Sequence, residues 1–286
     1  MKFKLIFLTV ILLFSKNTFS QCESVTVKST NNFTAFKLET LVESDGLRNG
    51  PDYNDATLFF PTNGNKNLKS IVLAPGYLRT QSTVTAWAKY LASRGFLRMT
   101  INMNSITDNP KLRAAALIDG METIRQENNR KSSPLYGKID INNIAVGGWS
   151  MGGGGAQLAA TIDNRIKTVI AFAPWLDKSI TFSSDSKQVS SVLIISGQND
   201  PIASPDQHSD LHYKNTPDST SKLLMEISGG RHRTPLNPKV GNGVVGNIAF
   251  AWLKVFLDGN KCYRKILNDK SLNKNSAISK YLTNLN

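Results

Sequence analysis

The chain has 286 residues, of which 40% are hydrophobic and 19% are charged, and its formal net charge at pH 7 is +13. That length and apolar content allow one large core, as in single α/β domains. The positive charge would suit an acidic partner such as nucleic acid. The sequence has, however, no zinc-finger pattern of paired cysteines and histidines, no aromatic RNP motif and no basic helix in heptads. We therefore expect a solvated basic surface and no nucleic-acid binding.

The N-terminal segment has the features of a secretory signal peptide. Lys2 and Lys4 precede an apolar stretch over residues 5–14, and small and polar residues then lead to Ser20. Because this stretch is shorter than the ~20 residues of a spanning helix, we predict cleavage near Ser20 and no stable membrane insertion. The mature protein is expected to be secreted to the extracellular space.

Only two cysteines occur, Cys22 and Cys262. An oxidising compartment would allow them to form a disulfide, and two free thiols are the open alternative.

Segments of strand length alternate with helical patterns along the chain. Strands are expected at 56–60 and 70–74, joined as a hairpin, and then at 96–103, 143–149, 167–173, 191–196 and 222–227. Helical spacing marks three segments between and after them, which carry Trp87 and Leu91, Leu117 and Met121, and Ile248 and Trp252. This alternation predicts a mostly parallel sheet with helices on both faces and an antiparallel hairpin at its start.

The sequence Gly148-Trp149-Ser150-Met151-Gly152 follows one of these strands and opens onto Gly153-Gly154-Gly155 and a helical segment. A G-x-S-x-G motif between a strand and a helix is typical of a nucleophile elbow, in which a sharp turn presents the serine. Glycine-rich turns also bind phosphate, but the lysine of a P-loop is missing here. We therefore predict that Ser150 is the nucleophile of an acyl-transfer reaction.

A serine nucleophile needs an imidazole base and an acid that orients it. Asp200 and His232 follow the strands 191–196 and 222–227, so both are expected at the carboxyl edge of the sheet. Asp177 and Asp206 are the alternatives for the acid.

His208 and His212 are spaced to share a helix face, as zinc ligands do, but a glutamate and a third ligand are missing. We expect no metal and no organic cofactor.

Two backbone N–H groups are needed to stabilise the oxyanion. Met151 follows the nucleophile and is expected to supply one of them. Tyr77, which follows Pro75-Gly76 at the end of strand 70–74, is expected to supply the other.

Several motifs together resemble the bacterial cutinases of the poly(ethylene terephthalate) hydrolase group. They are Pro75-Gly76-Tyr77, the Trp149-Ser150-Met151-Gly152 block, Ala173-Pro174-Trp175, Asn199-Asp200-Pro201-Ile202 and Gly229-Gly230-Arg231-His232. The resemblance implies an α/β-hydrolase fold without a lid domain, with the Ser150, Asp200 and His232 triad and the Tyr77 and Met151 oxyanion hole. It also implies that Trp149, Trp175 and Ile202 line the acyl cleft and that His208 packs behind the cleft tryptophan.

The chain departs from this family at the cleft rim, where Leu78 follows Tyr77 in place of a small polar residue. The disulfide that some plastic-degrading members carry near the active site is absent, since Gly197 and Thr234 stand at those places.

We expect a signal peptide at 1–20, a catalytic domain at 21–258 and a basic C-terminal tail at 259–286. The predicted activity is that of a monomeric, secreted serine esterase that cleaves polyesters and short-chain esters. The alternatives are a small-ester or lipid esterase and a non-catalytic binding protein on a hydrolase scaffold.

Overall fold

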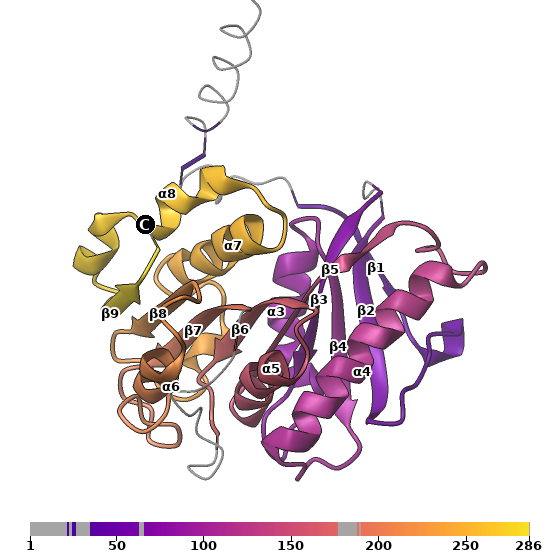
Figure 1. Cartoon of the computed structure of the whole chain (residues 1–286), viewed down its shortest axis with the longest axis horizontal. Helices are drawn as coiled ribbons and strands as arrows, with labels where there is room; N and C mark the ends of the chain where they lie inside the picture. Colours follow the sequence, from indigo (N-terminus) through magenta and orange to yellow (C-terminus); the bar gives the residue numbers. More distant parts are fainter. Residues whose placement is uncertain are drawn as a thin grey trace, which may run out of the picture.

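A computed structural model describes residues 22, 25–26, 35–62, 66–176, 188 and 190–285. The expected signal peptide and Asp177 lie outside these residues. A single mixed sheet with the strand order β1-β2-β4-β3-β5-β6-β7-β8-β9 forms the centre of the molecule (Figure 1). Within the described part of the chain, no helix is long and apolar enough to cross a membrane.

The strands, in chain order, are β1 (Leu38–Leu41), β2 (Tyr53–Pro61), β3 (Leu68–Ala74), β4 (Leu97–Met103), β5 (Ile139–Trp149), β6 (Ile166–Phe172), β7 (Ser191–Gly197), β8 (Lys222–Ile227) and β9 (Ile278–Thr283). The helices are α3 (Thr85–Ala92), α4 (Pro110–Asn129), α5 (Met151–Ile162), α6 (Ser209–Asn215), α7 (Val244–Phe256) and α8 (Arg264–Leu267).

The inner strands β4, β3, β5, β6, β7 and β8 run parallel, whereas β1, β2 and β9 pair antiparallel with their neighbours. This arrangement confirms the predicted α/β-hydrolase fold. In such a sheet the loops that follow the parallel strands meet at one edge, the carboxyl edge.

The predicted hairpin between 56–60 and 70–74 is wrong. Both strands exist, but β4 lies between β2 and β3, so β2 pairs with β4 and β3 pairs with β4 and β5. The residues after Pro61 do predict a turn. A local sequence pattern cannot show, however, that β4, which comes later in the chain, lies between the two strands that this turn joins. The antiparallel pair at the start of the sheet is β1 with β2.

The segment after Asp258 was expected as a basic tail, but it contributes a strand to the sheet. β9 pairs antiparallel with β8, and its Lys280 forms ion pairs with Asp210 and Glu226. Only Ile278 of β9 is buried, so this edge strand lacks the apolar run that marks an inner strand. The expected boundary at Asp258 therefore does not separate the chain's end from the folded sheet.

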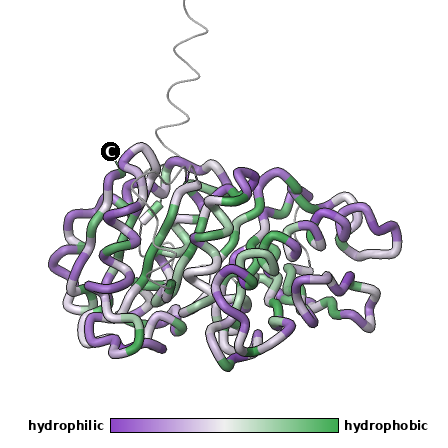
Figure 2. The backbone as a smooth tube through the Cα atoms, turned by 60° about the horizontal axis from the view of Figure 1, so that its bottom comes forward, coloured by the Kyte–Doolittle hydropathy of each residue, from purple (hydrophilic) through white to green (hydrophobic). Residues whose placement is uncertain are grey.

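Two apolar cores cover the two faces of the sheet. Alternation along β3 directs Ile71 and Leu73 to the core beneath α3 and α7, and Val72 and Ala74 to the core beneath α4 and α5. Figure 2 shows the apolar segments running through the interior and the hydrophilic ones along the outer loops. The sheet is thus buried on both faces, which leaves its edges and loops to carry polar chemistry.

A disulfide joins Cys22 to Cys262 across a sequence separation of 240 residues, with Cα atoms 4.9 Å apart. Lys265 donates a hydrogen bond to the carbonyl oxygen of Cys22 beside it. Of the two alternatives that the sequence left open, the structure thus has the bonded pair.

Replacing both Cys22 and Cys262 with serine is expected to lower the free energy of unfolding by about 2–5 kcal/mol, because the crosslink restricts the unfolded chain. Denaturant melts of the variant and of the oxidised and reduced wild type would measure this. An unchanged midpoint in all three would show that the link adds no stability, and the double variant treated with reductant controls for other effects of the reagent.

Candidate active site

Ser150 occupies the sharp turn between β5 and α5, with φ 56° and ψ −123°. L-residues rarely adopt this backbone conformation, so the turn needs external support. The backbone N–H of Ser150 donates to the carbonyl oxygen of Phe172 at 2.9 Å, and the carbonyl oxygen of Ser150 accepts from Trp175 at 2.9 Å and from Gly154 at 3.0 Å. These bonds tie the turn to the end of β6 and to the first turn of α5.

Two glycines flank the serine because no side chain would fit there. A Cβ on Gly148 would lie 2.5 Å from the carbonyl carbon of Gly152, and a Cβ on Gly152 would lie 2.4 Å from the carbonyl oxygen of Ala74. Moving the first of these backbone atoms would displace α5, and moving the second would displace β3. The motif predicted from the sequence is therefore a nucleophile elbow in its local geometry.

The structure brings Ser150, His232 and Asp200 together. His232 Nε2 lies 2.9 Å from Ser150 Oγ, and His232 Nδ1 lies 2.7 Å from Asp200 Oδ2. All three side chains are buried, and they follow β5, β8 and β7 respectively, at the carboxyl edge of the sheet. This is the order and spacing of a hydrogen-bonded nucleophile, base and acid.

The charge of Asp200 is held by its surroundings. Burial by itself would raise the pKa of Asp200, but hydrogen bonds from His232 and from the backbone N–H groups of Ala203 and Ile202 outweigh it, and the pKa lies below its ordinary value. An ionised carboxylate only accepts hydrogen bonds, so the imidazole proton resides on Nδ1. Nε2 is then free to accept the proton of Ser150.

The acid that contacts His232 is Asp200 and not Asp206. Asp206 is exposed, and Asp177 lies outside the described residues. His208 lies with its ring centroid 5.8 Å from that of Trp175, behind which the resemblance placed it. Burial and the nearby His208 lower the pKa of His212 to about 3, and within the described residues no group of three potential ligands could hold a metal ion.

The loop after β3 lies directly against the nucleophile. A Cβ on Gly76 would meet the Ser150 Cβ at 2.9 Å and the Trp149 ring at 2.7 Å, so Tyr77 follows a residue in contact with the serine. Met151 is the first residue of α5, where backbone N–H groups have no acceptor within the helix. The residues expected to supply the oxyanion donors are thus the neighbour of Ser150 in the chain and the neighbour of a glycine that packs against it.

The expected cleft residues fall into two groups. Trp149 is buried and its indole N–H donates to the carbonyl oxygen of His232 at 2.8 Å, so it supports the histidine loop and does not form an open cleft wall. Tyr77, Leu78 and Ile202 are 46%, 50% and 61% exposed. Trp175 is half-buried, and its backbone N–H donates to the carbonyl oxygen of Ser150.

Arg113 was missed by the sequence analysis. Its fully buried guanidinium donates to the carbonyl oxygens of Pro75 at 2.9 Å, Ile106 at 3.2 Å and Asp108 at 2.9 Å. Burial lowers the pKa of Arg113 to about 10, against the opposing attraction of Asp108, so the group remains charged at neutral pH. The feature of the sequence that could have indicated its burial is that Arg113 lies four residues before Leu117, which places Arg113 on the buried face of α4.

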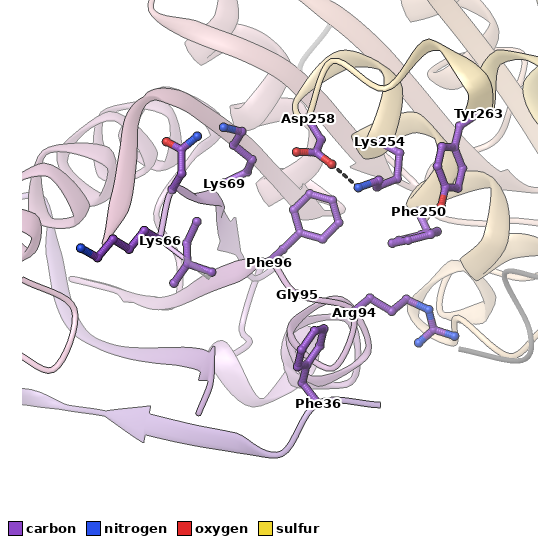
Figure 3. A pocket seen from close by; sticks show the side chains of 12 residues that line it. Phe36, Lys66, Lys69, Arg94, Gly95, Phe96, Phe250, Lys254, Asp258 and Tyr263 are labelled. Carbon is purple, nitrogen blue, oxygen red and sulfur yellow. Dashed lines mark hydrogen bonds and ion pairs between the residues drawn. The ribbon is translucent and has the colours of Figure 1, made fainter. Parts of the chain in front are cut away.

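A separate hollow of about 400 Å³ lies at the amino edge of the sheet, where the parallel strands begin (Figure 3). Its lining includes Phe96, which directly precedes β4, Phe250 of α7, and the ion pair of Lys254 in α7 with Asp258 just beyond that helix. The parallel strands begin at this edge and Ser150 lies where they end. The hollow is therefore distinct from the candidate active site.

Comparison with known proteins matches residues 25–285 to a family model described as "PETase: PET hydrolase-like". Cutinase est2 of Thermobifida alba is 33% identical over 230 residues, 79% of this chain and 72% of the relative. Cutinase 2 of Thermobifida cellulosilytica is 33% identical over 227 residues, 79% and 82% of the two chains. A bis(hydroxyethyl) terephthalate hydrolase of Streptomyces coelicolor is 29% identical over 217 residues, 75% and 66%.

Replacing Arg113 with methionine is expected to lower kcat for a short-chain nitrophenyl ester at least about tenfold while KM changes less than about twofold. The loop that carries Tyr77 would lose its anchor, and a lost oxyanion donor costs about 10²–10³ in kcat. Steady-state kinetics with circular dichroism of the folded protein would measure this.

Arg125→Met, which removes a half-buried arginine farther along α4, is the matched control. A folded Arg113→Met variant with the kcat of the control would contradict the assignment.

Proposed function

Because the chain belongs to the PET hydrolase-like family, we propose that it is a secreted serine esterase that cleaves polyesters and short-chain esters through an acyl-enzyme. The observation that carries the proposal is the unbroken hydrogen-bond chain from Ser150 Oγ through the imidazole of His232 to Asp200. The names of the relatives, cutinases and a bis(hydroxyethyl) terephthalate hydrolase, support the ester substrate class.

In the first half of the proposed reaction, Ser150 Oγ attacks the ester carbonyl carbon and its proton passes to His232 Nε2. Asp200 accepts the Nδ1–H and stabilises the imidazolium that results. The carbonyl oxygen becomes an oxyanion, to which the backbone N–H groups of Tyr77 and Met151 donate. Collapse of this intermediate breaks the bond to the leaving alcohol, which receives the proton from Nε2.

Water then completes the cycle by the same steps. His232 takes a proton from the water molecule and the hydroxide attacks the acyl carbon. The second intermediate then breaks its bond to Ser150 Oγ and releases the acid, and Oγ receives the proton from His232 Nε2. Every proton in this sequence is held or moved by the side chains already described.

The surface around the serine supports a large substrate. The exposed side chains of Tyr77 and Ile202 and the half-buried Trp175 make an apolar rim that is open to solvent. Export is supported by the signal-like N-terminus and by the disulfide between Cys22 and Cys262, since such bonds persist outside the cytosol.

Ser150→Ala and His232→Ala are each expected to lower turnover of nitrophenyl butyrate by about four orders of magnitude or more, because the residues of a triad act as a unit. His208→Ala should retain turnover within about tenfold of wild type. Turnover by His232→Ala close to the wild-type rate would refute the assignment of the base.

Stoichiometric labelling by a serine-directed organophosphate, read by mass spectrometry of the peptide that holds Ser150, separates an esterase from a non-catalytic binding protein.

Trp175→Ala is expected to lower release of terephthalate products from polyester film more than it lowers hydrolysis of nitrophenyl butyrate. A flat aromatic ring beside the scissile ester gains about 0.5–1.5 kcal/mol from ring contacts beyond its burial, and an aliphatic acyl chain gains less. The measurement is the ratio of the two activities in one buffer.

Trp175→Phe, which keeps a ring, should restore most of that ratio. An identical ratio in wild type and Trp175→Ala, or no film product from wild type, leaves a small-ester or lipid esterase as the better description.

A further inference from the structure

We propose that Leu78 and Ile106 together form an apolar contact for the part of a polyester chain that extends beyond the acyl cleft. The proposal rests on the proposed function. It adds Ile106 as a specificity residue, from a loop to which the proposed reaction assigns no role. Leu78 and Ile106 are 50% and 47% exposed. The two residues are neighbours through their backbones, and contiguous exposed apolar surface is a feature of interaction sites.

The two side chains come from different loops that are joined by the backbone. Leu78 lies in the loop after β3 and Ile106 in the loop after β4, and the N–H of Leu78 donates to the carbonyl oxygen of Ile106 at 2.7 Å. Since β3 and β4 are parallel neighbours, both loops leave the same edge of the sheet. The relative position of Leu78 and Ile106 is therefore fixed by the pairing of two strands and by a backbone hydrogen bond.

The backbone of Leu78 is in the left-handed region, with φ 55°. Glycine or asparagine adopts this conformation more readily than leucine, whose Cβ crowds the following carbonyl oxygen. Leu78 is thus a large apolar residue that is half exposed to solvent and has a backbone conformation unfavourable for leucine. Strain of this kind is typical of positions that serve binding or catalysis.

Hydrogen bonds fix the loop that contains Ile106. The carbonyl oxygens of Ile106 and Asp108 accept hydrogen bonds from the buried guanidinium of Arg113, and the Asp108 side chain accepts from the backbone N–H of Ser105 at 3.0 Å. A surface fixed in advance loses little conformational freedom on binding.

Continuity with the cleft identifies the occupant. Gly76 packs against Ser150, Tyr77 and Leu78 follow it in the chain, and the N–H of Leu78 donates to the carbonyl oxygen of Ile106. A butyrate ester has too few atoms to occupy the reacting centre and this pair at once, because its whole acyl chain spans only about four carbon atoms. A polymer whose scissile ester lies at Ser150 continues past Tyr77, so the pair selects for long apolar chains over small esters.

The test replaces Ile106 with serine, which removes the apolar side chain and leaves the backbone carbonyl that Arg113 and Leu78 bind. Ile162→Ser is the matched control, since Ile162 is 65% exposed and lies at the far end of α5, about 18 Å along the helix axis from Ser150. Each variant is assayed for nitrophenyl butyrate hydrolysis and for product release from polyester film. Each is also combined with Ser150→Ala to measure adsorption to the film without turnover.

Ile106→Ser is expected to lower film hydrolysis and film adsorption about three- to tenfold while butyrate kcat/KM stays within about twofold, and Ile162→Ser should change none of them. Equal adsorption and film activity in Ile106→Ser and the control would overturn the inference. An equal loss on both substrates would also overturn it, because the substitution would then act at the reacting centre. Failure of the proposed function is a separate result, namely no wild-type turnover of either substrate, and the adsorption comparison does not depend on it.

Discussion

The backbone turn at Ser150 is the constraint on which the rest of the site depends. A residue with φ 56° and ψ −123° persists only where its surroundings oppose relaxation, and here the supports come from Phe172, Trp175 and the first turn of α5. Those supports exist because β5 and β6 pair in parallel and because glycines let α5 approach the sheet closely. The position of the Ser150 hydroxyl is thus a consequence of how tightly two strands and a helix pack.

Two buried charges organise the loops around this turn, and neither depends on an ion pair with the other. Asp200 is stabilised by His232 and by two backbone N–H groups, and Arg113 is stabilised by three backbone carbonyl oxygens. Leaving such a group without partners would cost several kcal/mol, so each charge fixes the backbone that surrounds it. Asp200 thereby orients the His232 ring, and Arg113 holds the loop that carries Tyr77.

The disulfide stabilises the molecule away from this chemistry. Cys262 precedes Tyr263, which lines the hollow at the amino edge of the parallel strands, whereas the loops of the site lie at the carboxyl edge. The edge strands β1 and β9 are short and carry the charged residues Glu39 and Lys280, which discourages pairing with other chains. The crosslink and the short, charged edge strands therefore add to the stability given by the two cores without involving the loops near Ser150.

The sequence by itself determined the parallel alternation of strands and helices, the elbow at Ser150, and the choice of Asp200 and His232, because each is written in local spacing and in the chain order of the loops. Only the tertiary structure decided the strand that separates β2 from β3, the place of β9 and the pairing of the cysteines, since these depend on which distant segments meet. The same holds for Arg113 and for Ile106 beside Leu78. A residue's apolar spacing can show that its side chain is buried or exposed, but the carbonyl groups and loops that it reaches lie in segments that only folding brings together.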